Sequence, residues 1–263
     1  MPAETLGILV LGDVVGSPGI AAAAEGIRRV RGERPVDLVI ANGENADRGF
    51  GLSMRSYHAL KDAGVDLITL GNHAWDKKEI FEFIDHCDDI VRPANYPPGT
   101  PGKSRLIHMV RGHGIGLFQL QGRAFMGLSD CPFRAADAEI AALDEAEADL
   151  ILVDVHAEAT AEKQALARHM DGRVAAVTGS HTHVQTADER IFPSGTGYMG
   201  DVGMTGPWDS VVGMKPEQSL RRMREQLPVR FEVADGPTVF CAAWLQMDPS
   251  SGRTLRIERI QHR

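Results

Sequence analysis

The sequence predicts an α/β fold built around a mainly parallel β-sheet, and three observations support this class. In the first 75 residues, short apolar runs alternate with amphipathic stretches, which is the rhythm of βαβ units. The same alternation resumes between residues 106 and 178. The 263 residues are 43% hydrophobic and 24% charged, so the chain resembles ordinary globular proteins and can bury a sizeable core. Disordered and fibrous architectures are therefore disfavoured.

The first part of the chain supplies three expected strands, over residues 6–11, 38–41 and 67–70. Two amphipathic stretches separate them, and we expect helices over residues 18–31 and 53–63. Ser17 is the expected N-cap of the first helix, because its hydroxyl can accept a hydrogen bond from the first turn. Pro18 suits the first helical position.

The second part of the chain repeats this pattern and then departs from it. Further strands are expected over residues 106–110, 115–119, 150–155 and 174–178, with helices over 135–148 and 161–170. After residue 190, turn-forming residues separate three expected antiparallel strands, over 230–234, 238–247 and 254–260. Residues 204–227 are partly helical in pattern and are expected to form a surface excursion or cap. Since no long linker divides the chain, residues 1–263 are expected to be a single domain.

Charge and cysteine content narrow the classes of function. With 36 acidic and 28 basic residues, the net charge is −8, which argues against a protein that binds duplex nucleic acid or an anionic membrane surface. No apolar run approaches the roughly 18 residues of a transmembrane helix, and the first residues do not resemble a signal peptide. The three cysteines form no Cys-x-x-Cys pair, so we expect a reducing, cytoplasmic location.

Potential metal ligands follow five of the expected strands. The carboxyl ends of strands form the ligand-binding edge of an open α/β sheet, so these side chains are expected to meet there. They are Asp13, Glu44, Asn45, Asn72, His156, His181 and His183. Oxygen and imidazole ligands without cysteine suit zinc, iron or manganese better than calcium. Seven ligands are too many for one such ion, whereas two ions roughly 3.5–4 Å apart that share a carboxylate would use them all.

The order of these residues resembles that of the calcineurin-like metallophosphoesterases. The matching blocks are Gly12-Asp13-Val14-Val15, Asn42-Gly43-Glu44-Asn45, Gly71-Asn72-His73, His156 and Gly179-Ser180-His181-Thr182-His183. The details are most similar to the YmdB-like branch, whose members act as cyclic-nucleotide phosphodiesterases. The resemblance implies a four-layer αββα sandwich. It also implies a small-molecule phosphoester substrate, namely a 2′,3′- or 3′,5′-cyclic nucleotide.

The resemblance also implies a role for each site residue. Asp13, Asn45 and His183 would complete one metal site, and Asn72, His156 and His181 would complete the other. Glu44 would bridge two transition-metal ions, iron or manganese ahead of zinc. A hydroxide bridging the two ions would attack phosphorus, and His73 would protonate the leaving oxygen as general acid.

Three departures from the broad superfamily pattern bear on these roles. Val15 stands where a histidine ligand usually follows Asp13, so Asn45 would have to replace that ligand. Glu44 stands where the bridge is usually aspartate. Ala74 stands where an acid usually follows the catalytic histidine, which leaves Asp76 as the candidate partner of His73.

Simpler interpretations compete with each motif taken alone. A single buried histidine such as His156 is more often structural than a metal ligand. His181 and His183 would point to one side in extended backbone, yet such pairs are also common in solvated loops. The run Arg221-Arg222-Met223-Arg224 is typical of a solvated helix face, although it could help to attract phosphate. Trp75, Tyr198 and Trp208 are expected to serve packing.

Alternative functions remain open from the sequence. The same dimetal site would serve a phosphomonoesterase or a nuclease, and a nuclease is expected to have an open basic groove. A regulatory metal- or nucleotide-binding protein with vestigial hydrolysis is the alternative from another class. A homo-oligomer is compatible with all of them.

Overall fold

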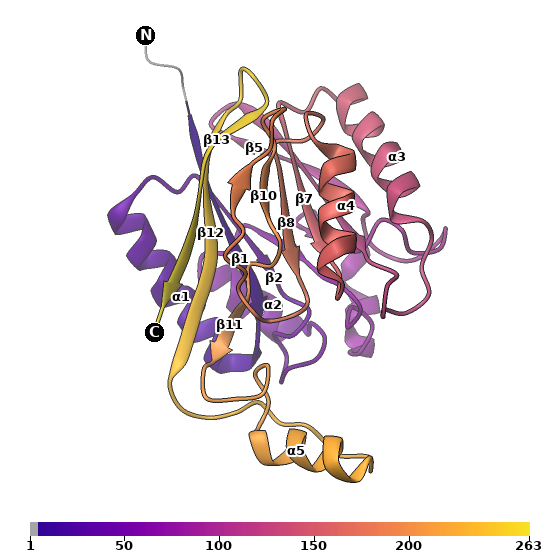
Figure 1. Cartoon of the computed structure of the whole chain (residues 1–263), viewed down its shortest axis with the longest axis vertical. Helices are drawn as coiled ribbons and strands as arrows, with labels where there is room; N and C mark the ends of the chain where they lie inside the picture. Colours follow the sequence, from indigo (N-terminus) through magenta and orange to yellow (C-terminus); the bar gives the residue numbers. More distant parts are fainter. Residues whose placement is uncertain (1–4) are drawn as a thin grey trace.

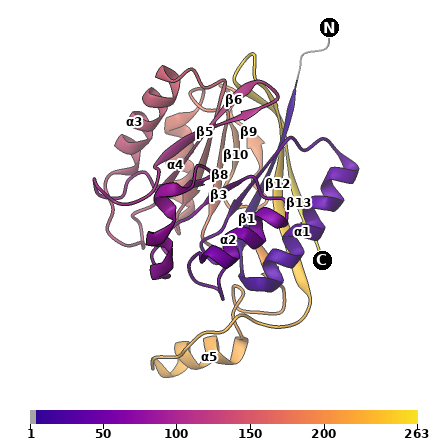
Figure 2. The same ribbon diagram turned by 180° about the vertical axis from the view of Figure 1, so that it is seen from behind.

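The computed structural model, which describes residues 5–263, contains two β-sheets packed face to face with helices on both outer faces (Figure 1). Helices α1 and α2 cover one sheet, and α3 and α4 cover the other; the reverse view shows the same order of layers (Figure 2). The predicted four-layer αββα sandwich is therefore confirmed. No helix in the described part of the chain is long and apolar enough to cross a membrane.

The first sheet has seven strands in the order β13-β12-β11-β1-β2-β3-β4. Their bounds are β1 Leu6–Val14, β2 Leu38–Asn42, β3 Leu67–Thr69, β4 Ile90–Val91, β11 Met204–Pro207, β12 Thr238–Asp248 and β13 Arg253–His262. The strands β1 to β4 and β11 run parallel, whereas β12 runs antiparallel to β1, β11 and β13. The carboxyl ends of β1, β2 and β3 consequently lie at one edge.

The second sheet has six strands in the order β5-β6-β7-β8-β10-β9. Their bounds are β5 Arg105–Val110, β6 His113–Gln121, β7 Leu150–His156, β8 Ala176–Ser180, β9 Arg190–Ile191 and β10 Gly197–Met199. Strands β6, β7, β8 and β10 are parallel to their neighbours in that series. His156 ends β7 opposite Ser180 at the end of β8, so this sheet too brings its candidate ligands to one edge.

Alternating side chains of the strands build the cores on either side of each sheet. On β1, Leu9 and Leu11 pack with Ile27 of α1, whereas Ile8 and Val10 pack against Leu152 and other residues of the second sheet. The period-two alternation of strands places successive side chains on opposite faces, so one strand serves two cores. Burial on both faces explains why the parallel strands appear in the sequence as continuous apolar runs.

The helices lie close to their expected positions, with one difference at the first of them. They are α1 Gly16–Glu33, α2 Met54–Asp62, α3 Pro132–Glu145, α4 Thr160–Met170 and α5 Pro216–Glu225. Ser53, expected as the first residue of its helix, is instead the N-cap of α2 and accepts the backbone N–H of Ser56. Ser17 is not the N-cap of α1, because the helix begins earlier, at Gly16, whose N–H donates to the carbonyl of Asn45.

The chain after residue 190 differs from expectation in two respects. Residues 230–234 do not form a strand; Val233 makes only an isolated bridge to Met214, because the neighbouring loop offers no longer partner. Met204–Pro207 forms β11 within the first sheet, so the chain leaves the sandwich after that strand. Elsewhere, two short 3-10 helices, Lys78–Glu82 and Ile84–His86, and the short strands β4, β9 and β10 were not expected, since elements of two to five residues carry no readable period.

Two glycines of α1 give a test of its packing. A Cβ atom at Gly26 would lie 2.2 Å from the ring of Phe240 in β12, whereas a Cβ atom at Gly32 would meet nothing within 4 Å. We expect Gly26→Ala to lower the free energy of unfolding by about 1–3 kcal/mol through overpacking. Gly32→Ala should instead raise it by about 0.5–1 kcal/mol, because alanine favours the helix. Urea denaturation of both variants measures the difference, and equal stabilities would contradict this packing.

Candidate metal centre

The predicted ligands converge from the two sheets on one edge of the sandwich. Asp13 lies near the end of β1, Glu44 and Asn45 directly follow β2, and Asn72 follows β3. The second sheet contributes His156 from the end of β7, and His181 and His183 from the segment after β8. Every predicted ligand therefore lies at the end of a strand or in the segment that follows it.

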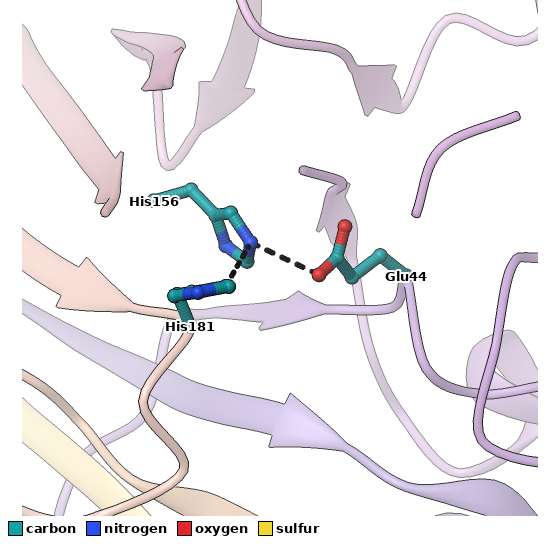
Figure 3. Close-up of side chains that lie close together, drawn as sticks. All are labelled: Glu44, His156 and His181. Atoms are coloured by element: carbon teal, nitrogen blue, oxygen red, sulfur yellow. Dashed lines mark hydrogen bonds and ion pairs between the residues drawn. The ribbon is translucent and has the colours of Figure 1, made fainter. Parts of the chain in front are cut away.

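Side chains from both sheets converge on Nε2 of His156. It lies 2.9 Å from Oε1 of Glu44, 2.8 Å from Oδ1 of Asn72 and 3.1 Å from Nδ1 of His181. Figure 3 shows Glu44 and His181 approaching His156 from different elements. One ring nitrogen can present one proton or one lone pair, so it cannot satisfy three partners at once. A cation among these four side chains would satisfy all of them.

Asp13 and Asn45 carry buried oxygens without hydrogen-bond partners among residues 5–263. Oδ2 of Asp13 accepts the backbone N–H of His181 at 3.0 Å, whereas no described residue donates a hydrogen bond to Oδ1. The side-chain amide of Asn45 donates to the carbonyl of Gly49, and its Oδ1 has no hydrogen-bond donor within the described part of the chain. An unsatisfied buried acceptor costs about 1–3 kcal/mol, so both oxygens fit a second cation better than an empty site. Nε2 of His183 lies 3.7 Å from the free oxygen of Asp13, as a third ligand would.

Hydrogen bonds on the far side of each ring orient the histidines for metal binding. Ser180 Oγ donates to Asp154, so the same oxygen accepts from Nδ1 of His156 at 2.9 Å. Nδ1 of His183 donates to the carbonyl of Val212 at 2.9 Å. In both rings Nδ1 is held as a donor by this outer contact, and Nε2 is the nitrogen that faces the centre. Metal-binding histidines are commonly oriented by such outer contacts.

The loop that carries His181 and His183 is not extended. Both residues have left-handed backbone, with φ of 97° and 63°, so the rings reach the site through a turn. Residues other than glycine adopt this region at an energetic cost, and such strain gathers at functional sites. Asp201 secures the turn, because its Oδ2 accepts the Thr182 N–H, the Thr182 hydroxyl and Nζ of the buried Lys163.

His73 lies beside the ligands rather than among them. Its backbone N–H donates to Oε2 of Glu44 at 2.7 Å, and its Nδ1 lies 2.8 Å from Oδ2 of Asp76. Asp76 is thus the carboxylate partner that the sequence suggested. The ring of Phe50 packs edge-on against His73, with the two ring centroids 5.1 Å apart. The Nε2 atom of His73 makes no hydrogen bond to any described residue.

Burial and charge shift the pKa values of the central groups. Burial raises the pKa of Asp13 to about 6. Burial alone would also raise the pKa of Glu44, but the charge and hydrogen bond of His156, together with His73, lower it to about 2. Glu44 in turn raises the pKa of His156 to about 9 against the effect of burial. Without a cation, a proton on His156 therefore balances the buried carboxylates, and a metal ion would take its place.

A cavity of about 360 Å³ opens over these groups. Its floor includes Glu44, His73 and His181, and Phe231 forms part of an apolar wall. Arg222 and Met223 of α5 also line it, so the basic run in the sequence contributes one side chain to the site. The volume is in the range of pockets for small ligands.

Sequence reasoning missed the residues that support the ligands. Asp154 accepts hydrogen bonds from Thr69, Gln119 and Ser180, and Glu158 lies 3.3 Å from Nε2 of His181. A signal for Asp154 existed, since it stands two positions before His156 on an apolar strand and thus faces the same side. The expected packing roles of two aromatic residues are confirmed, because Trp75 stacks on Phe81 and buried Tyr198 stacks on Phe192.

Comparison with known proteins shows the family of the chain and supports the fold. A family model described as "YmdB-like protein" matches residues 9–260. A 2′,3′-cyclic-nucleotide 2′-phosphodiesterase of Bacillus subtilis (strain 168) is 48% identical over 253 residues, which cover 96% of each chain.

Two solved structures are similar over nearly the whole chain. A hypothetical protein from Thermus thermophilus has 46% identity and a TM-score of 0.91, covering 98% of this chain and 99% of that one. A novel phosphatase from Mycoplasma pneumoniae has 33% identity and a TM-score of 0.93, with coverage of 99% and 94%. The αββα sandwich is thus of the phosphatase type that the sequence resemblance implied.

The buried ion pair beneath the histidine turn gives a testable consequence. Nζ of Lys163 lies 2.7 Å from Oδ2 of Asp201, and both side chains are almost fully buried. Lys163→Met leaves the buried charge of Asp201 without its cation, so we expect the free energy of unfolding to fall by about 3–5 kcal/mol. Urea denaturation measures this change. In the matched control, Lys215→Met removes an exposed pair with Glu232, and its unfolding midpoint should stay near that of the wild type. Equal effects of the two substitutions would refute the supporting role of Lys163.

Proposed function

Because the chain belongs to the YmdB-like family, we propose that it is a phosphodiesterase that hydrolyses 2′,3′-cyclic nucleotides at a site for two transition-metal ions. The observation that carries this proposal is the convergence of Glu44, Asn72 and His181 on one nitrogen of His156. The named activity of the Bacillus subtilis relative supports the choice of substrate.

The donor set suits two ions that share Glu44. Asp13, Asn45 and His183 would hold one ion, and Asn72, His156 and His181 would hold the other. The unpaired oxygens of Asp13 and Asn45 support the first group, and the crowded Nε2 of His156 supports the second. Carboxylate, amide and imidazole ligands without thiolate favour iron or manganese, with zinc as the alternative.

The bound ions would supply an activated water and neutralise the charge of the phosphate. In the reaction, water adds to phosphorus, the bond from phosphorus to O2′ breaks, and the product is a nucleoside 3′-phosphate with a free 2′-hydroxyl. An alkoxide is a poor leaving group, so O2′ needs a proton as the bond breaks. Nε2 of His73 would donate it, and the contact of Asp76 with the opposite ring nitrogen supports this role.

The protein around the reacting atoms orients the nucleotide. Phe50 and Phe231 offer apolar faces to the nucleoside, and Arg222 offers a positive charge at the cavity wall. These contacts support a role for α5 as a cap on a single domain, since α5 lies apart from the sandwich in both overall views (Figures 1 and 2). Cys87, Cys131 and Cys241 form no disulfide, which supports a cytoplasmic location. Three further expectations stay predictions: turnover of 3′,5′-cyclic nucleotides, assembly into a homo-oligomer, and no binding of duplex nucleic acid.

Substitutions of His73 and Glu44 should distinguish a loss of catalysis from a loss of metal binding. We expect His73→Ala to retain the metal content of the wild type and to lower kcat for a 2′,3′-cyclic nucleotide by about 10²- to 10⁴-fold, the usual contribution of a general acid. Glu44→Ala should lose both metal and activity. Metal analysis of the purified variants and steady-state kinetics measure the two effects. In the wild type, removal of the metal with a chelator should abolish turnover, and readdition should restore it.

A second histidine provides the control for His73. His169 lies 2.9 Å from Asp137 in an exposed pair on α3 and α4, so His169→Ala removes a similar interaction far from the ligands. Its kcat should match that of the wild type. Unchanged kinetics in His73→Ala would remove His73 from the mechanism.

The substrate proposal is tested by a panel at saturating metal. It comprises 2′,3′-cyclic AMP, 3′,5′-cyclic AMP and p-nitrophenyl phosphate. We expect the highest kcat/KM on the 2′,3′-cyclic nucleotide, and phosphorus NMR should identify the 3′-monophosphate as its product. A higher kcat/KM on the monoester would favour a phosphomonoesterase instead.

A further inference from the structure

A second, larger depression lies next to the catalytic cavity. It is an open groove of about 1120 Å³ between α1, α2 and the segment 229–233. Phe50 and Phe231 line both the groove and the catalytic cavity, and their ring centroids are 6.4 Å apart. Phe50 also packs 5.1 Å from the ring of His73. The groove therefore begins at the aromatic pair that borders the general acid.

The groove carries unneutralised positive charge in an acidic protein. Arg48, Arg55 and Arg230 line it, and none of them forms a salt bridge or hydrogen bond in the described part of the chain. The other charges are mostly paired: Lys77 lies 3.1 Å from Asp47, and Glu232 lies 2.8 Å from Lys215. Asp62 is the remaining acid of the lining. Against a net charge of −8, this local excess of arginine marks a site for anions.

The loop between β2 and α2 joins the groove to the metal centre. It carries Glu44 and Asn45 at one end and Arg48 and Phe50 at the other. Arg48 is held in left-handed backbone, with φ of 57°, and the Asn45 side chain fastens the turn through the carbonyl of Gly49. The positions of ligands and groove residues are thus coupled through a few residues of backbone.

The chemistry of the proposed substrate says what enters such a groove. In a 2′,3′-cyclic phosphate, O2′ and O3′ of the ribose are both bonded to the reacting phosphorus. A longer substrate can therefore continue only from O5′. Such ends arise when the 2′-hydroxyl of an RNA attacks its own backbone. An RNA chain that leaves the site at its 5′ side carries phosphates for the arginines, and its bases can stack on Phe50 or Phe231.

We propose that the enzyme acts on single-stranded RNA fragments that end in a 2′,3′-cyclic phosphate, and that Arg48, Arg55 and Arg230 bind the phosphates on the 5′ side of the reacting nucleotide. This inference rests on the proposed function, because it extends the same reaction to a longer substrate. The open shape of the groove suits a single strand, whereas the acidic remainder of the surface disfavours a duplex.

The test compares 2′,3′-cyclic UMP with a uridine tetranucleotide that ends in a 2′,3′-cyclic phosphate. At low salt, the wild type should show a kcat/KM about tenfold or more higher for the tetranucleotide, because each neutralised phosphate strengthens binding. Three phosphate contacts, one for each arginine, should give this kcat/KM a slope of about −2.1 against salt concentration on logarithmic axes. The mononucleotide should show little salt dependence.

The double variant Arg55→Glu/Arg230→Glu should lose the advantage of the tetranucleotide and keep the mononucleotide rate. Arg134→Glu, on α3 across the molecule, alters charge without touching the groove and should keep both rates; circular dichroism checks folding of each variant. Equal kcat/KM for the two substrates in the wild type, or equal losses on both in the double variant, would overturn the groove proposal alone. Failure of the metal-loaded wild type on both substrates would overturn the proposed function itself.

Discussion

The contact between Glu44 and Nε2 of His156 is the interaction on which the arrangement of the site depends. Glu44 follows β2 of the seven-stranded sheet, and His156 ends β7 of the six-stranded sheet. Their separation is fixed by the core between the sheets, where Ile8 and Val10 pack with Leu152. Gly71 permits the close approach, because a Cβ atom there would lie 2.5 Å from both Glu44 and His156. Ligand geometry is thus a property of how the two sheets pack.

The pattern of apolar runs predicted the strands and the edge at which their ends gather, because each candidate ligand lies at or just after a strand end. The sandwich and the family came from the resemblance that the ordered motifs carry. The resemblance to the YmdB-like branch is confirmed by the family match and the close relative. Other features depended on tertiary contacts. The left-handed backbone of His181 and His183 is fixed by Asp201, which lies far along the chain. Ser17 does not cap α1, because Asn45 already binds the first amide of that helix.

The net charge of −8 acquires a different meaning once the acids are located. Asp13 and Glu44 are buried at the metal centre, where cations would balance them. Outside it, arginines without partners in the described part of the chain line the adjoining groove, although the composition as a whole argued against binding of duplex nucleic acid. Overall composition excludes a broad basic surface but says nothing about a local one. A small anionic substrate and a single strand attached to it are both compatible with this distribution.

The central claim is that the convergent side chains hold two ions with Glu44 between them. Anomalous diffraction from crystals grown with manganese tests it most directly, because the signal locates each ion without reference to activity. The account predicts two peaks roughly 3.5–4 Å apart, one among Asp13, Asn45 and His183 and one among Asn72, His156 and His181. A single peak at saturating manganese, or two peaks that do not share Glu44, would contradict it.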